Sequence, residues 1–246
     1  MTMRFDVATL FVEMCEMILG ESIIGRAQKS GAISCHVHNI RDFAMDKHNR
    51  VDDTPYGGGK GMLLKAPPIY RCYEHIVEEA GHRPHVIFMS PQGKILTQAR
   101  AAELSQKDHI MVLCGHYEGV DERVLCRIVD EEISVGDYVL TGGELPAMLL
   151  IDCIARLCDG VLADEACFVN ESHYSGLLEY PHYTRPEVWE GMQVPQVLMS
   201  GHHANIELWR RQQSILRTAR KRPDLIEKAD LTAEDKLFLK EIGQEF

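Results

Sequence analysis

The sequence predicts an α/β fold with a parallel sheet, followed by a small all-α C-terminal domain. Three short apolar runs, 86–89, 110–114 and 138–140, have the length and composition of strands and alternate with helix-like segments. Each run is followed by glycines, which is typical of the loops at the carboxyl ends of parallel strands. The C-terminal third lacks this alternation and contains one long helical pattern instead.

Composition narrows the class of protein. The chain has 246 residues, 45% of them hydrophobic, which is enough for a sizeable core. Its net charge of −11 argues against a uniformly basic nucleic-acid binder and directs attention to local patches. The eight cysteines form no C-x-x-C pair, so we expect them to be reduced. With neither a signal peptide nor a membrane-spanning run in the pattern, we expect a soluble, cytoplasmic protein with no membrane partner.

The first elements are a strand at 4–10 and an amphipathic helix. The apolar face of that helix is expected to hold Met14, Met17 and Ile18. A second strand follows at 33–40.

His36 and His38 alternate with apolar residues and are expected on one face of the second strand. This spacing can bind a metal ion, but the sequence shows no third ligand. We therefore interpret them as two surface histidines and predict no dedicated metal site.

The glycine-rich loop at 41–62 contains Gly57, Gly58, Gly59, Lys60 and Gly61. The spacing G-x-x-x-x-G-K-[ST] is not met, because Gly61 stands where a magnesium-binding hydroxyl is required. The pattern does not predict a Walker nucleotide site. It leaves open a flexible loop whose backbone lies against a ligand or RNA.

The middle of the chain alternates strictly between helices and strands. Helices are expected at 67–80, 95–104 and 121–127, with loops at 90–93 and 115–119 after the strands at 86–89 and 110–114. No G-x-G-x-x-G occurs at these turns, so a Rossmann dinucleotide site is not supported. The ligand site of such a sheet is expected at the carboxyl ends of its strands.

The stretch 131–146 organises the candidate site. Its β-prone run 138–140 is followed by a Gly142-Gly143 turn, and Pro146 then suits the first turn of a helix. The helix is expected to place Arg156 near its end. A strand that passes through paired glycines into a helix leaves backbone N–H groups free for a ligand. An ordinary strand–turn–helix is the alternative interpretation.

The C-terminal third begins with a segment at 159–176 that has no clear periodicity and is expected to be a linker or lid. A long helix is predicted at 204–221. Its tail is basic, with Arg210, Arg211, Arg217, Arg220, Lys221 and Arg222. Such a run is often a solvated face, but in an acidic chain it is also typical of phosphate contact. Thr232-x-x-Asp235 predicts the capped start of a last short helix.

Five motifs in register resemble one known family. They lie at 51–62, 90–93, 115–119, 131–146 and 181–187. Together they are similar to the bacterial tRNA (guanine-N1)-methyltransferases of the SPOUT superfamily, which modify position 37 next to the anticodon. The resemblance covers almost the whole chain.

The resemblance implies a homodimer that acts on tRNA and uses S-adenosylmethionine, with magnesium as a further requirement. It implies a methyltransferase domain at 1–160 with a deep trefoil knot, a linker at 161–177 and a helical tRNA-binding domain at 178–246. Carried over residue by residue, the cofactor pocket comprises Pro91, Gly115, Glu118, Ser134, Val135, Gly136, Asp137, Tyr138, Val139, Leu140, Gly142, Gly143 and Pro146.

The chemistry of the family requires two catalytic groups. Guanine N1 carries a proton at neutral pH, so a base must accept it, and charge then builds on O6. The family's arginine matches Arg156, which would stabilise O6. The family's base is a linker aspartate, and the flanking residues place Glu171 at its position, which is a departure from the family pattern.

Two other functions stay open at this stage. The change at position 171 allows an RNA-binding protein that has lost activity. The loop at 57–61 allows a nucleotide-binding α/β protein.

Overall fold

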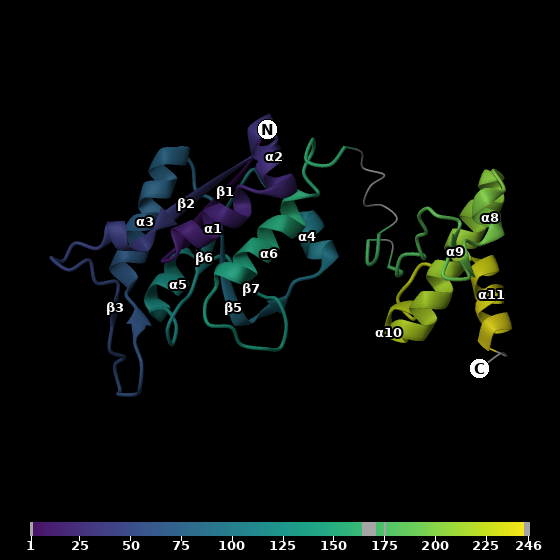
Figure 1. The fold of residues 1–246 in the computed structure, drawn as a ribbon. Helices are drawn as coiled ribbons and strands as arrows, with labels where there is room; N and C mark the ends of the chain where they lie inside the picture. Colours follow the sequence, from purple (N-terminus) through teal and green to yellow (C-terminus); the bar gives the residue numbers. More distant parts are fainter. Residues whose placement is uncertain (1, 164–170, 175, 244–246) are drawn as a thin grey trace. The chain divides into compact units, whose positions relative to one another are not determined.

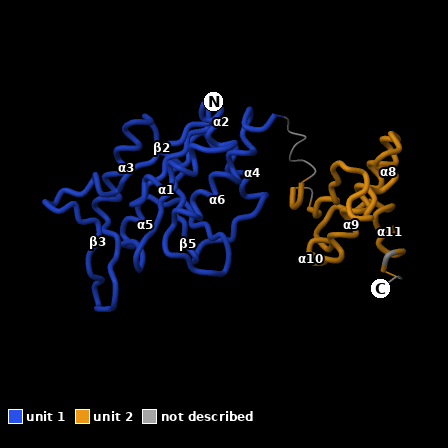
Figure 2. The backbone as a smooth tube through the Cα atoms, viewed as in Figure 1, with its two compact units in different colours: residues 1–164 blue, residues 165–246 orange. Residues whose placement is uncertain are grey.

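The computed structural model describes residues 2–163, 171–174 and 176–243 (Figure 1). The chain forms two compact units, Met1–Asp164 and Glu165–Phe246, and each is described by itself (Figure 2). No helix within the described ranges has both the length and the apolar character needed to cross a membrane.

The first unit is built on a five-stranded parallel sheet with the order β2-β1-β6-β5-β7. The strands are β1 (Met3–Thr9), β2 (Ile33–Asn39), β5 (His85–Ile95), β6 (His109–Cys114) and β7 (Glu131–Ser134). The prediction of a parallel α/β sheet is confirmed. A smaller antiparallel pair, β3 (Asp52–Asp53) and β4 (Leu63–Leu64), forms the base of the glycine-rich loop, which follows the short helix η1 (Ile40–Phe43).

Helices cover both faces of the sheet. They are α1 (Val12–Leu19), α2 (Ser22–Ser30), α3 (Ala66–Ala80), α4 (Gln98–Leu104), α5 (Glu122–Ile128) and α6 (Glu144–Ala155). One apolar core packs α1, α2, α4 and α6 on one face, and a second core packs α3 and α5 on the other. Along β6, Ile110 and Val112 belong to the first core, whereas Met111 and Leu113 belong to the second. This two-sided burial explains why the strand is a continuous apolar run.

The structure corrects the prediction of a strand at 138–140. The third glycine-bearing strand is β7, which ends at Ser134, and Tyr138, Val139 and Leu140 lie in the loop that follows it. Val139 is 82% exposed. Residues with high strand propensity form a strand only where a neighbouring strand provides hydrogen-bond partners. The edge of the sheet next to β5 is already occupied by β7.

The predicted boundary at 90–95 also differs. Strand β5 continues to Ile95, and Met89 and Lys94 both lie opposite Ile133 of β7. Residues 90–93 therefore leave the ladder as the expected loop, but the strand resumes after them. Helix α4 starts at Gln98 rather than 95, because the Thr97 side chain caps it by accepting a hydrogen bond from the backbone N of Arg100 (3.2 Å).

The predicted face of α1 is wrong. Cys15 and Leu19 are buried, whereas Met14, Met17 and Ile18 are exposed. The side of α1 that packs on the sheet buries only Cys15 and Leu19. The larger apolar side chains Met14, Met17 and Ile18 form an exposed patch on the outside of the helix. Helix α2, which the sequence analysis did not predict, follows directly and adds Ile24 and Ala27 to the same core.

The second unit is mostly helical, with α8 (Gln196–Met199), α9 (His203–Lys221), α10 (Pro223–Ile226) and α11 (Ala233–Gly243). It also contains an antiparallel ribbon of β8 (Val188–Trp189) and β9 (Met192–Gln193), so it is not all-α. The long helix is confirmed as α9. The capped start of α11 is confirmed as well, since Thr232 N donates to Asp235 Oδ2 (3.0 Å) and Asp235 N to Thr232 Oγ1 (3.2 Å).

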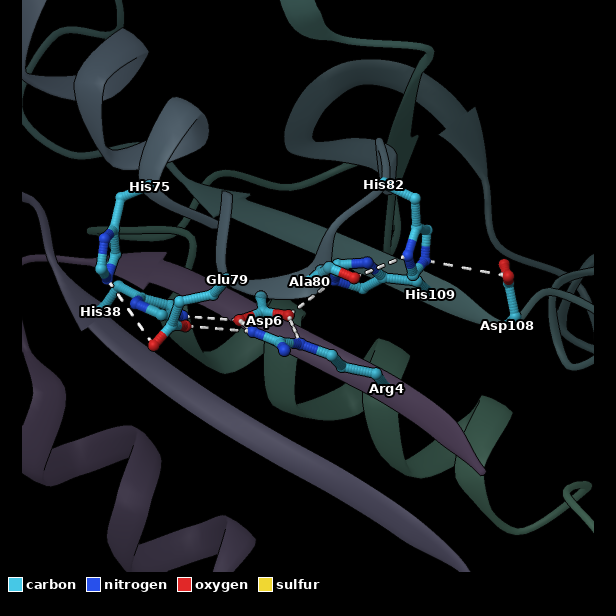
Figure 3. Close-up of polar contacts among 9 residues, drawn as sticks. All are labelled: Arg4, Asp6, His38, His75, Glu79, Ala80, His82, Asp108 and His109. Carbon is cyan, nitrogen blue, oxygen red and sulfur yellow. Dashed lines mark hydrogen bonds and ion pairs between the residues drawn. The ribbon is translucent and has the colours of Figure 1, made fainter. Parts of the chain in front are cut away.

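Asp6 is a fully buried carboxylate in β1 (Figure 3). It accepts hydrogen bonds from His109 Nε2 (2.6 Å), His38 Nε2 (2.6 Å) and Arg4 Nε (2.7 Å). Burial raises the pKa of Asp6, but the bonds from His109, His38 and Arg4 outweigh this effect and hold the pKa well below its ordinary value. The expectation of two surface histidines therefore holds for His36 and is wrong for His38, whose ring binds this buried carboxylate.

We expect Asp6→Asn to lower the free energy of unfolding at pH 7 by about 3–5 kcal/mol, because three donors lose their charged acceptor. Urea unfolding followed by circular dichroism measures this change. The exposed carboxylate Asp159 is the control, and Asp159→Asn should shift the free energy by no more than about 0.5 kcal/mol.

The pH dependence of the parent protein follows from the lowered pKa. The stabilisation from Asp6 is present above the ordinary carboxyl pKa and is lost as the pH falls below about 4 toward the folded-state value. If Asp6→Asn and the parent lose stability equally over that range, the Asp6 cluster is not a stabilising interaction.

Candidate functional site

A pocket lies in the first unit, where β5, β6 and β7 end their shared ladders. Its lining comprises Phe88, Met89, Ser90, Pro91, Gly115, His116, Tyr117, Glu118, Gly119, Ile133, Ser134, Val135, Tyr138, Val139, Leu140, Thr141, Gly142, Gly143 and Pro146. The pocket holds about 730 Å³ of empty space, including open solvent at its mouth. This size and mostly apolar wall suit a small organic ligand.

The first segment that lines the pocket comes from β5, where residues 90–93 leave the ladder with β7. Ser90 and Pro91 belong to the residues that leave the ladder between Met89 and Lys94. The excursion returns at Gly93, where an added Cβ would lie 2.4 Å from the carbonyl carbon of Glu132. Only glycine lets the two backbones come this close, so Gly93 fixes where the loop rejoins the sheet.

The loop after β6 (115–121) and the loop after β7 (135–143) are the second and third pocket loops, and they are joined through their main chains. Gly143 N donates to Gly115 O (2.8 Å), and His116 forms an isolated β-bridge with Gly142. A Cβ on Gly143 would lie 2.8 Å from Cys114 Cα. The paired glycines of the third loop thus allow close packing on the end of β6, and Gly115, Gly142 and Gly143 all line the pocket.

A buried carboxylate directly follows these glycines in the chain. Glu144 is the first residue of α6, and its Oε1 accepts a hydrogen bond from Thr9 Oγ1 (2.8 Å) at the end of β1. Its place in the first turn of a helix favours the negative charge. A Cβ on Gly142 would lie 2.4 Å from Glu144 Oε2 and 2.9 Å from His116 Nδ1.

The thiols near the pocket are poor nucleophiles. Burial raises the pKa of Cys15 to about 11, and the charge of Glu144 adds to this effect. Burial and Glu144 also raise the pKa of Cys114 well above its ordinary value. Because the thiolate is the reactive form, the geometry does not support cysteine chemistry here.

Most of the predicted cofactor residues lie together in this pocket. Gly136 and Asp137 do not line it. Gly136 instead shapes the third loop: its N–H donates to Ser134 Oγ (3.1 Å), and a Cβ at its φ of +151° would meet the ring of Tyr138. Eight further lining residues were not among the predicted cofactor residues. They lie within the motifs or directly before the motif at 90–93, and they are Phe88, Met89, Ser90, His116, Tyr117, Gly119, Ile133 and Thr141.

The two predicted catalytic residues lie in different units. Arg156 is the C-cap residue of α6 in the first unit, as the sequence predicted. Glu171 belongs to the second unit, where its backbone O accepts a hydrogen bond from Tyr174 N (3.3 Å). Residues 164–170 and 175 of the predicted linker lie outside the described residues.

The glycine-rich loop is a hairpin tip and not a strand-to-helix phosphate loop. Gly57, Gly58, Gly59 and Gly61 all have positive φ between β3 and β4. The hairpin packs on the second pocket loop, since Glu118 N donates to Met62 O (3.1 Å) and a Cβ on Gly61 would lie 2.3 Å from Glu118 Cγ. This arrangement does not support the nucleotide-binding interpretation.

The basic face of α9 is partly neutralised within the second unit. Arg211 pairs with Asp235 (2.7 Å) and Arg222 with Asp224 (2.7 Å). Arg210 pairs with Glu207 (2.7 Å) and lies over the ring of Tyr180, 5.0 Å from its centroid. The predicted basic run also includes Arg217, Arg220 and Lys221, which lie toward the C-terminal end of α9.

Comparisons with known proteins agree on one family. A family model described as tRNA (Guanine-1)-methyltransferase TrmD matches residues 3–228. A tRNA (guanine-N(1)-)-methyltransferase of Ruminiclostridium cellulolyticum is 59% identical over 226 residues, covering 92% of this chain and 97% of the relative. A protein of the same name from Caldanaerobacter subterraneus subsp. tengcongensis is 54% identical over 243 residues, covering 99% of this chain and 100% of the relative.

A solved structure is also similar. The crystal structure of tRNA (m1G37) methyltransferase from Aquifex aeolicus has a TM-score of 0.76 and 43% sequence identity. The similarity covers 96% of this chain and 100% of that one.

Proposed function

This chain belongs to the tRNA (guanine-1)-methyltransferase family, and we propose from that premise that it methylates N1 of the guanosine at tRNA position 37, with S-adenosylmethionine as the methyl donor. Its relatives at 59% and 54% identity are transferases that act on guanine N1 in tRNA, and the chain is an enzyme of this class. The name of the Aquifex aeolicus enzyme specifies position 37, and for this chain that position is part of the proposal.

The proposal for the methyl donor is supported by the pocket that the three loops form. S-Adenosylmethionine presents a flat apolar ring, polar ribose groups and positive charge. Phe88, Ile133 and Leu140 supply apolar wall, Thr141 supplies a hydroxyl, and Glu118 supplies a carboxylate. When bound, the donor provides an electrophilic methyl group on its sulfonium.

Two residues of this chain are proposed to act on guanine. A carboxylate at Glu171 would accept the N1 proton, which must leave before or during transfer. A guanidinium at Arg156 would stabilise the negative charge that then builds on O6, because it is planar, always charged and a strong donor. What supports these roles is the match of each position to the family pattern, with glutamate at 171 in place of aspartate.

The same proposal assigns a separate role to each part of the chain. The methyltransferase domain at 1–160 holds the pocket, the segment 161–177 links the domains, and 178–246 binds tRNA. The long helix α9, with Arg217, Arg220 and Lys221 toward its C-terminal end, supports the last assignment. Phosphate contact by such side chains is the usual source of affinity for nucleic acid.

The proposal includes a homodimer and a deep trefoil knot. Helices α1 and α6 lie side by side (Figure 1). Met14 in α1, Leu145 in α6 and Phe11, the N-cap residue of α1, are exposed apolar side chains. Exposed apolar patches of this kind mark protein interfaces. The main-chain contacts between the loops after β6 and β7 are compatible with the knotted arrangement of the family.

Magnesium is the remaining component that the family implies. Mg²⁺ usually keeps several waters and binds through one or two carboxylates together with groups of the substrate, so it does not require a cage made of protein ligands alone. We include Mg²⁺ as a requirement of the reaction and assign it no protein ligands.

Methyl transfer to defined tRNA tests the function. Purified protein is incubated with methyl-labelled S-adenosylmethionine and a tRNA transcript that carries guanosine at position 37, and the modified nucleotide is mapped. We expect label only at position 37 and none in a transcript with adenosine there. Label at another guanosine would refute the position, and tRNA binding without label would favour the non-catalytic RNA-binding protein.

The tight packing behind Gly142 generates a first prediction for the pocket. Gly142→Ala should weaken S-adenosylmethionine binding by about tenfold or more, because its Cβ would displace Glu144 and His116, and His116 lines the pocket. Isothermal titration calorimetry measures the affinity. Gly243→Ala is the matched control, since a Cβ there meets nothing within 4 Å. Equal affinities of both variants would remove the third loop from the donor site.

A second prediction concerns the proposed base. Glu171→Gln should slow the methyl-transfer step by about 10²–10⁴-fold, the usual contribution of general-base catalysis, while leaving the affinities for donor and tRNA unchanged. Single-turnover methylation separates this step from product release. Glu227→Gln, at an exposed carboxylate of the same unit, should react at the parent rate. If Glu171→Gln also reacts at the parent rate, the base is another residue.

A third prediction concerns tRNA affinity. Replacing Arg217, Arg220 and Lys221 together with Gln should make the slope of log affinity against log salt less negative by about 0.7–0.9 for each phosphate that the variant no longer neutralises. Fluorescence anisotropy of labelled tRNA at several salt concentrations measures the slope. Arg26→Gln, an exposed cation of the first unit, should leave the slope unchanged. A triple variant with the parent slope would show that α9 is only a solvated face.

A further inference from the structure

Three metal-ligating side chains meet in the first unit at a place that the methylation pocket does not reach. His38 comes from β2, and His75 and Glu79 come from α3 (Figure 3). One ligand atom from each lies within 4.8 Å of those of the other two. None of the three residues lines the pocket described above.

His38 is held in an orientation that suits a metal ligand. Its Nε2 lies 2.6 Å from Asp6 Oδ1 and is the nitrogen directed at this buried carboxylate. Nδ1 makes no hydrogen bond within the described part of the chain, so it is the nitrogen left for a metal ion. A histidine whose second nitrogen donates to a carboxylate is the usual arrangement around a protein-bound metal ion.

The two residues of α3 are spaced to chelate. His75 and Glu79 are four residues apart and so lie on the same helix face. His75 Nε2 and Glu79 Oε1 are 3.9 Å apart, which is too long for a hydrogen bond but close enough for both to bind one ion after small side-chain rotations. Arg4 Nη2 donates to the other oxygen, Glu79 Oε2 (3.2 Å), which leaves Oε1 toward His75.

The position of the cluster allows an ion to enter. The side chains of His75 and Glu79 are 44% and 47% exposed, whereas that of His38 is 10% exposed. The ring of Phe43 lies 5.3 Å from that of His75, and the ring of His38 lies 5.9 Å from it. The two ligands from α3 are therefore accessible to solvent, and the rings of Phe43 and His38 lie next to the ring of His75.

We propose that His38, His75 and Glu79 bind one divalent transition-metal ion, with Zn²⁺ as the best-suited ion and water completing the coordination. Two imidazoles and one carboxylate form a ligand set that Zn²⁺ uses, whereas Mg²⁺ prefers oxygen ligands only. Such an ion would join the edge strand β2 to α3, and so would stabilise the sheet edge without taking part in methyl transfer.

Zn²⁺ titration of the full-length protein, freed of metal by chelation and dialysis, tests the proposal. A competing chromophoric chelator reports the affinity. We expect one equivalent per chain with a Kd in the micromolar range or lower, and an increase in the thermal unfolding midpoint on saturation. His75→Gln and Glu79→Gln should each weaken binding by about tenfold or more and leave the methylation rate unchanged, which also shows that they fold.

His36→Gln is the matched control. His36 lies on the same strand two residues before His38, is exposed and contributes no ligand to the cluster. Its Zn²⁺ affinity should equal that of the parent.

Co²⁺ substitution identifies the ligand atoms. We expect visible d–d bands without the intense near-ultraviolet band of a cobalt–thiolate bond, because the cluster contains no cysteine. No binding at about 100 µM Zn²⁺, parent-like affinity in His75→Gln and Glu79→Gln, or a thiolate band would each overturn the proposal, and the last would place the ion on the cysteines.

Discussion

The main-chain contact between Gly143 and Gly115 is the constraint on which the pocket depends. The hydrogen bond from Gly143 N to Gly115 O (2.8 Å) brings the loop after β7 onto the end of β6, and no side chain fits at Gly143 against Cys114 Cα. The loop after β6 in turn receives the glycine-rich hairpin through Met62 and Glu118. Three segments far apart in sequence thus meet through backbone atoms, which is why the site carries no nucleotide-binding fingerprint.

Two buried carboxylates stabilise opposite parts of the first unit by different means. Asp6 is held charged by three side-chain donors, and it connects β1 to β2 and β6. Glu144 lies in the first turn of α6 and receives one hydrogen bond from Thr9. Asp6 therefore anchors the edge of the sheet near α3, whereas Glu144 packs close to Gly142 of the pocket lining. The first arrangement also orients His38, and the proposed metal site depends on that orientation.

The sequence predicted the strands that are buried on both faces of the sheet. Continuous apolar runs such as 110–114 are buried on both faces in the structure, so composition alone identified them. It failed for 138–140, where β-prone residues lie in a loop because β7 already occupies the sheet edge. It also assigned the wrong face of α1, since Met14 and Met17 are exposed and the smaller Cys15 is buried. Hydrophobic periodicity cannot distinguish a core from an outward apolar patch.

The motifs by themselves determined the family, the parallel sheet and most of the pocket lining, because those residues are local in sequence and act through backbone geometry. Only the tertiary structure decided what each polar side chain contacts. His38 had no visible partner in its own strand, and its neighbours proved to be Asp6 in β1 and His75 and Glu79 in α3. Arg211 and Arg222 belonged to a basic run in the sequence and are neutralised by Asp235 and Asp224 in the fold. The partner of a charge depends on which strand or helix packs beside it, and local sequence does not encode that information.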